Sequence, residues 1–132
     1  MSCFWDSLIN TINIQDFKYY LNYNNNNKPN PQLFANLLKQ NNMKTSNIVW
    51  NNIALTEKQL DENYEAVNCY DTNTVNNGYF CSTFEPFLFL VSELFEVSIK
   101  HNYNGNNQFY ENKKKTLHIF RFLSNTGHFY IK

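Results

Sequence analysis

The chain is poor in glycine and proline, with only three of each among 132 residues. This scarcity argues against an all-β fold built from many short strands and tight turns. Its 11 basic and 11 acidic side chains cancel to a net charge of zero. We therefore expect no nucleic-acid partner that depends on a large basic surface. The basic run Lys113–Lys115 is better explained as a hairpin loop or a solvated strand edge.

Long apolar runs are also missing. The most apolar stretch, Phe84–Phe95, is interrupted by Glu85, Ser92 and Glu93, so no segment is predicted to span a membrane. The N-terminus is not basic and its apolar stretch is short, so no signal peptide is predicted. Three cysteines without regular spacing favour reduced thiols in the cytoplasm and no metal site.

Asparagine is the residue in excess, with 25 among the 132. Codon bias in an AT-rich genome explains such an excess without any function. Because asparagine favours turns and helix caps over element interiors, we expect these residues in loops. Six of them lie within residues 22–30, which we predict to be a loop.

The apolar periodicity predicts helices in the first two thirds of the chain. Helical stripes are expected over residues 3–12 with Ser2 as the N-cap, in a second helix capped by Asp16, and from Pro31 to about residue 41. The Thr56–Gln59 capping box predicts a helix to about residue 68. The stretch 85–95 is predicted to be the central helix, with Ser82 or Thr83 as its cap.

Strands are predicted in the last third, where the apolar period changes to two from residue 97 onward. Asn104-Gly105 is a hairpin signal, and further strands are expected up to Ile131, including one that starts at Leu117. Helices followed by strands indicate an α+β fold with a small, mostly antiparallel sheet flanked by helices. We expect one domain over residues 1–132, because 42% apolar residues suffice for one core.

The two ends of the chain carry the residues best suited to chemistry. Cys3 lies at the start of the first predicted helix, where the helix dipole stabilises a thiolate. His128 follows Gly127 in the last predicted strand and can serve as a general base. The two side chains meet only if the first helix packs beside the last strand.

In this order, the motifs resemble the ovarian-tumour (OTU) family of cysteine proteases, in particular its small viral members. The matching segments are Cys3-Phe4-Trp5-Asp6-Ser7-Leu8 at the start of a buried helix, Gly78-Tyr79-Phe80-Cys81-Ser82-Thr83 before the central helix, and Gly127-His128-Phe129-Tyr130 in the final strand. The resemblance covers nearly the whole chain. It implies a papain-like fold in which Cys3 is the nucleophile and His128 the base.

The chain departs from the family pattern at three points. No Asp precedes the cysteine, and the upstream backbone that could shape an oxyanion hole is absent, which leaves the amides of Cys3 and Phe4 as donors. Tyr130 stands where many members have the Asp or Asn that orients the histidine. The resemblance therefore implies a Cys–His dyad that needs no cofactor, with the imidazole tautomer held by a tyrosine hydroxyl or a backbone carbonyl.

The resemblance also implies a substrate, ubiquitin or a ubiquitin-like protein, bound by a monomer. Trp5, Tyr79 and Phe129 are the predicted walls of the cleft for its Gly-Gly tail. The acidic residues of the predicted helix 57–68 would complement the basic residues of that tail, although such a face is normally just solvated. Asp6 is either a solvated helix residue or a partner that orients His128.

The remaining cysteines and histidines have simpler explanations. Cys69 lies at a helix end rather than a start, and Cys81 falls where the family has substrate-channel residues. His101 and His118 sit in strand-like alternations, which favours structural or exposed positions, and they are the fallback bases.

Two alternatives to a deubiquitinase stay open. One is a catalytically inactive domain of the same fold that binds ubiquitin or a host protein. The other is a viral structural or interaction protein without any link to ubiquitin.

Overall fold

A computed structural model of the chain describes residues 2–114 and 118–132. Most of the helical part precedes most of the sheet along the sequence, as the periodicity predicts. The helices are α1 (Cys3–Thr11), α2 (Ile14–Leu21), α3 (Pro31–Gln40), α4 (Glu57–Cys69), the short 3-10 helix η1 (Thr72–Thr74) and α5 (Cys81–Leu94).

The sheet has six strands in the order β2-β1-β4-β3-β5-β6. All neighbouring pairs are antiparallel except β3 and β5, which run parallel. The α+β class with a mostly antiparallel sheet is therefore confirmed. The strands are β1 (Ile48–Trp50), β2 (Ile53–Ala54), β3 (Ser98–Tyr103), β4 (Asn106–Asn112), β5 (Ile119–Ser124) and β6 (Phe129–Ile131).

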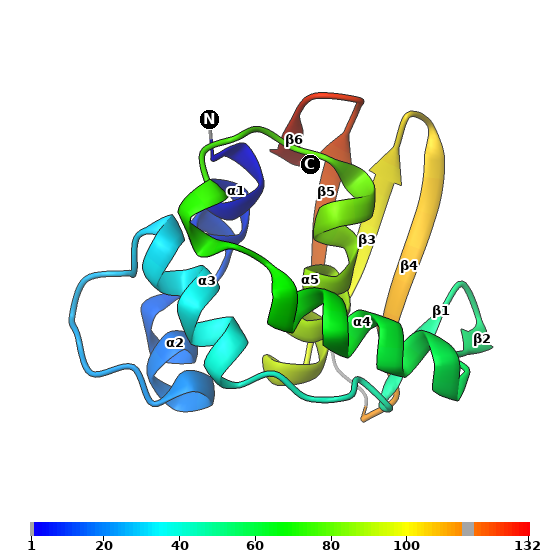
Figure 1. Ribbon diagram of the computed structural model, residues 1–132, viewed down its shortest axis with the longest axis horizontal. Helices are drawn as coiled ribbons and strands as arrows, with labels where there is room; N and C mark the ends of the chain where they lie inside the picture. Colours follow the sequence, from blue (N-terminus) through cyan, green and yellow to red (C-terminus); the bar gives the residue numbers. More distant parts are fainter. Residues whose placement is uncertain (1, 115–117) are drawn as a thin grey trace.

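The helices lie on one face of the sheet, with α5 crossing it at the centre (Figure 1). Nine residues of α5 are buried, in agreement with its prediction as the central helix. Strand residues alternate accordingly, so that Ile99 and Phe122 are fully buried while Lys100 and Arg121 are exposed. No helix in the described part of the chain is long and apolar enough to cross a membrane.

Asparagines cap and turn the chain, as expected from their excess. Asn13 and Asn30 are the N-caps of α2 and α3, each accepting a hydrogen bond from a backbone amide of the first turn. The prediction of Asp16 as the cap of α2 is wrong, because Asn13 precedes it and accepts from the Asp16 amide at 2.9 Å. The capping box of Thr56 and Gln59 is confirmed.

Most residues with a left-handed backbone conformation are also asparagines. Four of the five non-glycine residues with positive φ in the described part are Asn22, Asn51, Asn52 and Asn104, and asparagine tolerates this conformation better than most residues. Asn51 and Asn52 form the turn of the β1–β2 hairpin, which the sequence patterns did not predict. Asn104-Gly105 joins β3 to β4 as predicted.

The start of α5 differs from its prediction. The helix begins at Cys81, and its N-cap residue is Phe80, which provides no side-chain cap. The prediction of Ser82 or Thr83 as the cap is therefore wrong. Lys115 of the basic run and Leu117 of the predicted strand lie outside the described residues.

The two ends of α5 are packed in different ways. We call the first the aromatic end, where stacked and edge-on rings surround Phe84 near the start of the helix; it comprises Phe4, Trp5, Tyr79, Phe84 and Phe129.

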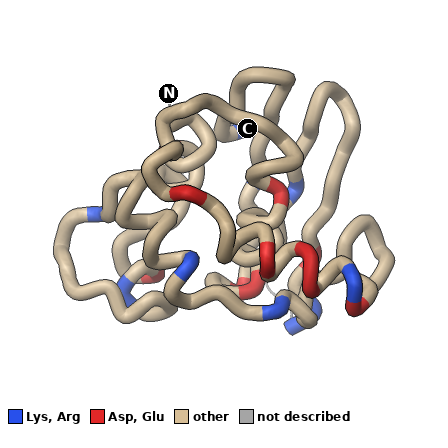
Figure 2. The backbone as a smooth tube through the Cα atoms, viewed as in Figure 1, with Lys and Arg blue, Asp and Glu red and all other residues tan. Residues whose placement is uncertain are grey.

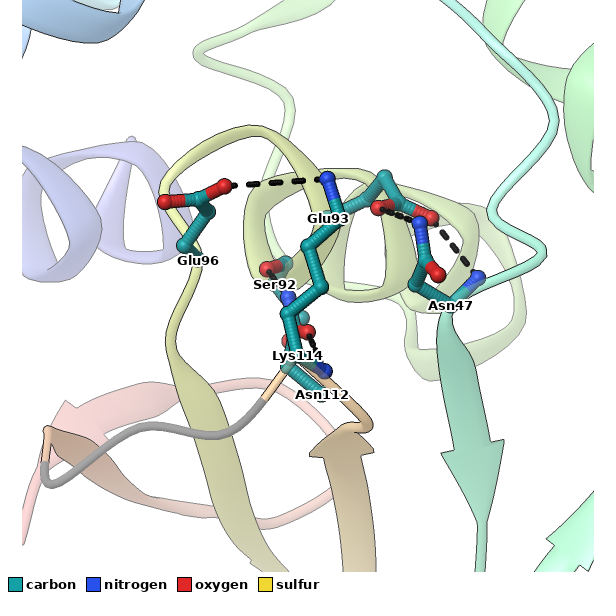
Figure 3. A network of polar contacts seen from close by, with 6 residues as sticks. All are labelled: Asn47, Ser92, Glu93, Glu96, Asn112 and Lys114. Carbon is teal, nitrogen blue, oxygen red and sulfur yellow. Dashed lines mark hydrogen bonds and ion pairs between the residues drawn. The ribbon is translucent and has the colours of Figure 1, made fainter.

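The second, the polar end, surrounds the last turn of α5 and comprises Asn47, Ser92, Glu93 and Asn112 (Figure 3). The Asn47 backbone and side-chain amides donate to the Glu93 carboxylate at 3.0 and 2.9 Å. The Asn112 side chain donates to the Ser92 carbonyl at 2.8 Å. Strands β1 and β4 are thereby tied to the end of the helix.

Candidate active site

Cys3 is the first residue of α1 and is half-buried. Ser2 occupies the N-cap position as predicted, but its side chain does not cap the helix. Its hydroxyl instead donates to the Asp6 carboxylate at 2.6 Å. The backbone amides of the first turn consequently lack a side-chain acceptor, and Asp6 is engaged with Ser2 rather than with His128.

His128 lies in the turn between β5 and β6 and is exposed. Asn125 shapes this turn, since its side-chain oxygen accepts from the amides of Gly127 and His128 at 3.1 and 3.0 Å. The imidazole stacks on the Tyr130 ring, with centroids 5.8 Å apart and an interplanar angle of 25°. Tyr130 thus contacts the histidine through its ring face.

The fold brings the segments that carry Cys3 and His128 to one place. Helix α1 packs against β6, and the residues that follow the two candidates, Phe4 and Phe129, have ring centroids 4.9 Å apart. The Ser7 hydroxyl also donates to the Phe129 carbonyl at 3.3 Å. The first helix and the last strand therefore meet, as the dyad requires. In the described part of the chain no hydrogen bond joins the Cys3 thiol to the His128 ring, and the catalytic role of the pair stays a prediction.

The three predicted cleft residues come together in the same region, but as core. Trp5, Tyr79 and Phe129 are 0%, 3% and 1% exposed. Trp5 donates through its indole nitrogen to the Tyr70 hydroxyl at 3.4 Å, and Tyr79 and Phe129 have ring centroids 5.2 Å apart. These contacts leave none of the three rings open to an incoming peptide, so their observed role is to hold α1, α5 and β6 together.

A network of polar side chains, which the sequence patterns did not predict, lies next to these aromatic rings. His101 Nε2 and Ser124 Oγ are 2.6 Å apart, and the Tyr79 hydroxyl interacts with both Ser124 and the Cys81 thiol. The burial of Ser124 could have been predicted, because Ser124 is two residues from Phe122 and therefore lies on the same, buried face of β5. The alternation does not show that His101 is the hydrogen-bond partner of Ser124.

Cys81 and His101 are poorly suited to act as a nucleophile and its base. Burial raises the pKa of the Cys81 thiol, although the Tyr79 hydroxyl opposes this shift. Burial also lowers the pKa of His101 to about 4. Both shifts favour the neutral forms and oppose a thiolate–imidazolium pair. The structural role expected for His101 agrees with its 1% exposure.

Cys69 also shows no sign of activation. It is exposed at the end of α4, where its thiol donates to the Glu65 carboxylate at 3.3 Å. That hydrogen bond and the negative charge of Glu65 raise the pKa of the thiol. The described residues contain no group of three or more His, Cys, Asp and Glu side chains that could hold a metal ion.

The acidic residues of α4 form a solvated face. Glu57, Asp61, Glu62 and Glu65 are all exposed, and Figure 2 shows acidic residues along this helix. Asp61 pairs with Lys44 at 2.7 Å, with both side chains more than half exposed. Helix α4 packs against α5, and a role for its acidic face in substrate binding stays a prediction.

Ser7 was missed as a residue of the candidate site. It lies one helical turn after Cys3, and residues four apart share a helix face. The spacing therefore indicates that Ser7 lies on the same helix face as Cys3. Only the structure shows that Ser7 is buried and donates a hydrogen bond to Phe129, in the strand that follows His128.

Comparisons of the chain with protein-family models, with curated proteins and with solved structures found no match. The resemblance to the OTU proteases therefore rests on the order of its motifs alone.

Proposed function

We propose that the protein is a cysteine-type deubiquitinase, in which Cys3 and His128 hydrolyse the bond after the C-terminal glycine of ubiquitin or a ubiquitin-like protein. The single observation that carries the proposal is the packing of α1 on β6. It brings the residues adjacent to Cys3 and His128 into ring contact at 4.9 Å. The motif order described above supports the assignment of ubiquitin as the substrate.

The reaction would be an acyl transfer in two steps. The Cys3 thiolate attacks the glycine carbonyl carbon, and the imidazolium of His128 protonates the leaving amine as the carbon–nitrogen bond breaks. A water molecule then attacks the thioester while His128 accepts its proton. The thiolate leaves, the new carboxylic acid releases its proton to solvent, and the products are the free ubiquitin carboxylate and the regenerated thiolate–imidazolium dyad.

The start of α1 supplies the groups that would stabilise the oxyanion. The Ser2 side chain does not occupy the first-turn amides, so the N–H groups of Cys3 and Phe4 are available as donors at the positive end of the helix dipole. One such donor is typically worth about 3 kcal/mol in the transition state.

A ubiquitin probe with a C-terminal electrophile tests the proposal directly. We expect the full chain to form a covalent adduct at Cys3, visible as a mass increase equal to the probe. Cys3→Ser and His128→Ala should both lose the adduct. Cys69→Ser is the matched control, because Cys69 is exposed but carries a thiol of raised pKa, and this variant should label like the parent.

The second candidate is a binding domain without catalysis. It is favoured by the exposed His128 ring, whose observed partner is the Tyr130 ring and not the Cys3 thiol. This candidate predicts no adduct but measurable binding of unmodified ubiquitin. If neither an adduct nor binding is detected, both functions are excluded and the interaction protein without a link to ubiquitin is favoured.

A further inference from the structure

The outer face of the sheet, opposite the helices, contains a hollow of about 540 Å³ that plays no part in the proposed dyad. Register places three side chains beside one another across its floor. Lys100 on β3 is paired with Phe109 on β4 and, on the other side, with Arg121 on β5. A volume of this size falls in the range of small-molecule sites.

The hollow is lined by cations of three segments. Lys100, Arg121 and Lys132 all contribute to its wall, and the Lys132 amide donates to the Arg121 carbonyl at 3.0 Å, which fixes the two segments together. No Asp or Glu lines the hollow among the described residues. Glu111 shares this face of β4 but lies two residues beyond Phe109.

Among the described residues, no Asp or Glu side chain forms an ion pair with Lys100, Arg121 or Lys132. The ion pairs found in residues 2–114 and 118–132 join Lys44 to Asp61 and Lys114 to Glu96, and neither involves the hollow. Lys100 is also held in place, because its ammonium nitrogen lies 5.5 Å from the centre of the Phe109 ring. The site therefore keeps positive charge in a chain whose net charge is zero.

An amide side chain of the hollow adds hydrogen-bond donors. The Asn107 side-chain oxygen accepts from Asn102 at 2.8 Å, and the Gln108 side-chain oxygen accepts from Asn51 at 2.9 Å. Register places Asn107 on the same face as Lys100 and Phe109, whereas Gln108 pairs with the buried His101 and belongs to the opposite face. Because the Asn107 oxygen is engaged, its NH₂ group is the part of this side chain left to bind a ligand. Cations together with amide donors select for an anion.

We propose that this hollow binds the phosphate groups of a nucleotide, either free or within a single-stranded nucleic acid. The guanidinium of Arg121 matches two phosphate oxygens at once, and Lys100 adds a point charge beside it. A doubly charged phosphate suits this cluster of cations, and the volume leaves space for the attached sugar and base. The inference is independent of the proposed protease activity.

Titration of the ¹⁵N-labelled full chain with inorganic pyrophosphate at low salt tests the site. We expect saturable NMR shifts of the Lys100, Asn102, Gln108 and Arg121 amides. Arg121→Gln should weaken binding at least fivefold. The matched control is Lys58→Gln, which removes the same charge from the exposed surface of α4 and should leave the affinity unchanged.

Two further titrations identify the source of the phosphate. Binding of ADP more tightly than of an eight-residue single-stranded RNA supports a free nucleotide. Tighter binding of the RNA, weakening steeply with salt, supports a nucleic-acid backbone. The proposal is overturned if pyrophosphate gives no saturable shifts at these amides. It is also overturned if Arg121→Gln and a second variant, Lys100→Gln, both bind like the parent, or if citrate binds as tightly as pyrophosphate.

Discussion

The aromatic end and the polar end of α5 hold the same helix against the same sheet by different interactions. At the aromatic end, Phe4 lies with its ring centroid 4.5 Å from Phe84 and 4.9 Å from Phe129. At the polar end, the Glu93 carboxylate accepts two hydrogen bonds from Asn47. Ring packing is weakly directional, whereas each of these hydrogen bonds requires one particular partner.

The difference indicates that the two ends have separate structural roles, one in strand register and the other in apolar burial. The polar end fixes the register of β1 and β4 against the helix, because a shift by one residue would leave buried amides and a carboxylate unpaired. The aromatic end buries five aromatic side chains, so we expect it to contribute more to the free energy of unfolding. The candidate dyad lies at this end, so its geometry depends on the fit of rings. Four substitutions test this contrast.

The largest expected effect is at the aromatic end. Trp5 is fully buried among Phe4, Phe34, Phe84 and Phe87, so Trp5→Ala should lower the free energy of unfolding by about 3–5 kcal/mol. Urea denaturation followed by circular dichroism measures this change. The half-buried Trp50 provides the control, and Trp50→Ala should cost less. Equal losses would contradict the importance of the aromatic end.

The second effect concerns His101, the buried histidine of the described residues, whose ring packs against Tyr79 and Phe129. The pKa of His101 is lowered by burial from 6.5 to about 4, so the unfolded chain binds the proton more readily between these values. The associated stability is fully present above pH 6.5 and is lost as the pH falls towards 4, by about 3 kcal/mol in total.

His101→Gln isolates this contribution, since glutamine still offers Ser124 a hydrogen-bond partner but does not titrate. Urea denaturation at pH 7, 5.5 and 4 should show a smaller loss of stability on acidification for the variant than for the parent. Parallel losses in the two proteins would assign the pH dependence to the carboxylates.

The third effect is at the polar end. Glu93→Ala leaves the half-buried amides of Asn47 without an acceptor, and we expect a loss of about 1–3 kcal/mol in unfolding free energy. Glu93→Gln keeps one acceptor oxygen, so its loss should be smaller. If the two variants unfold at the same urea concentration, the hydrogen bonds from Asn47 do not set the stability of this end.

The smallest expected effect on stability is that of the histidine in the candidate dyad. His128 is exposed, so His128→Ala should change the free energy of unfolding by no more than about 0.5 kcal/mol. Labelling by the ubiquitin probe should nevertheless be lost. A stable variant that still labels would remove His128 from the mechanism.

The fold class was predictable because its signals are local. The capping box at Thr56, the Asn104-Gly105 turn and the apolar period of α5 each depend on residues close in sequence, and the structure confirms all three. The β1–β2 hairpin was not predicted, because its strands of three and two residues are too short for a periodic pattern. The parallel pairing of β3 with β5 is a tertiary property.

The candidate site was only partly accessible to the same reasoning. The sequence predicts Cys3 at a helix start, which is confirmed, and His128 in a final strand, which is wrong because His128 lies in the turn just before β6. The meeting of their segments depends on packing between residues 122 positions apart, such as Ser7 and Phe129. Trp5 belongs to the apolar stripe expected to be buried in the first helix, but its assignment to a cleft wall with Tyr79 and Phe129 did not anticipate that all three rings are buried. Aromatic residues suit both a cleft and a core, and composition does not distinguish them.

The contact between α1 and β6 has a consequence for how the chain folds. The hydrogen bond from Ser7 to Phe129 closes a loop of more than a hundred residues, and such closure is entropically costly and raises the contact order. We therefore expect the contact between α1 and β6 to form late in folding, after α1 has packed against α3. The segments that carry Cys3 and His128 would therefore come together only in this late step.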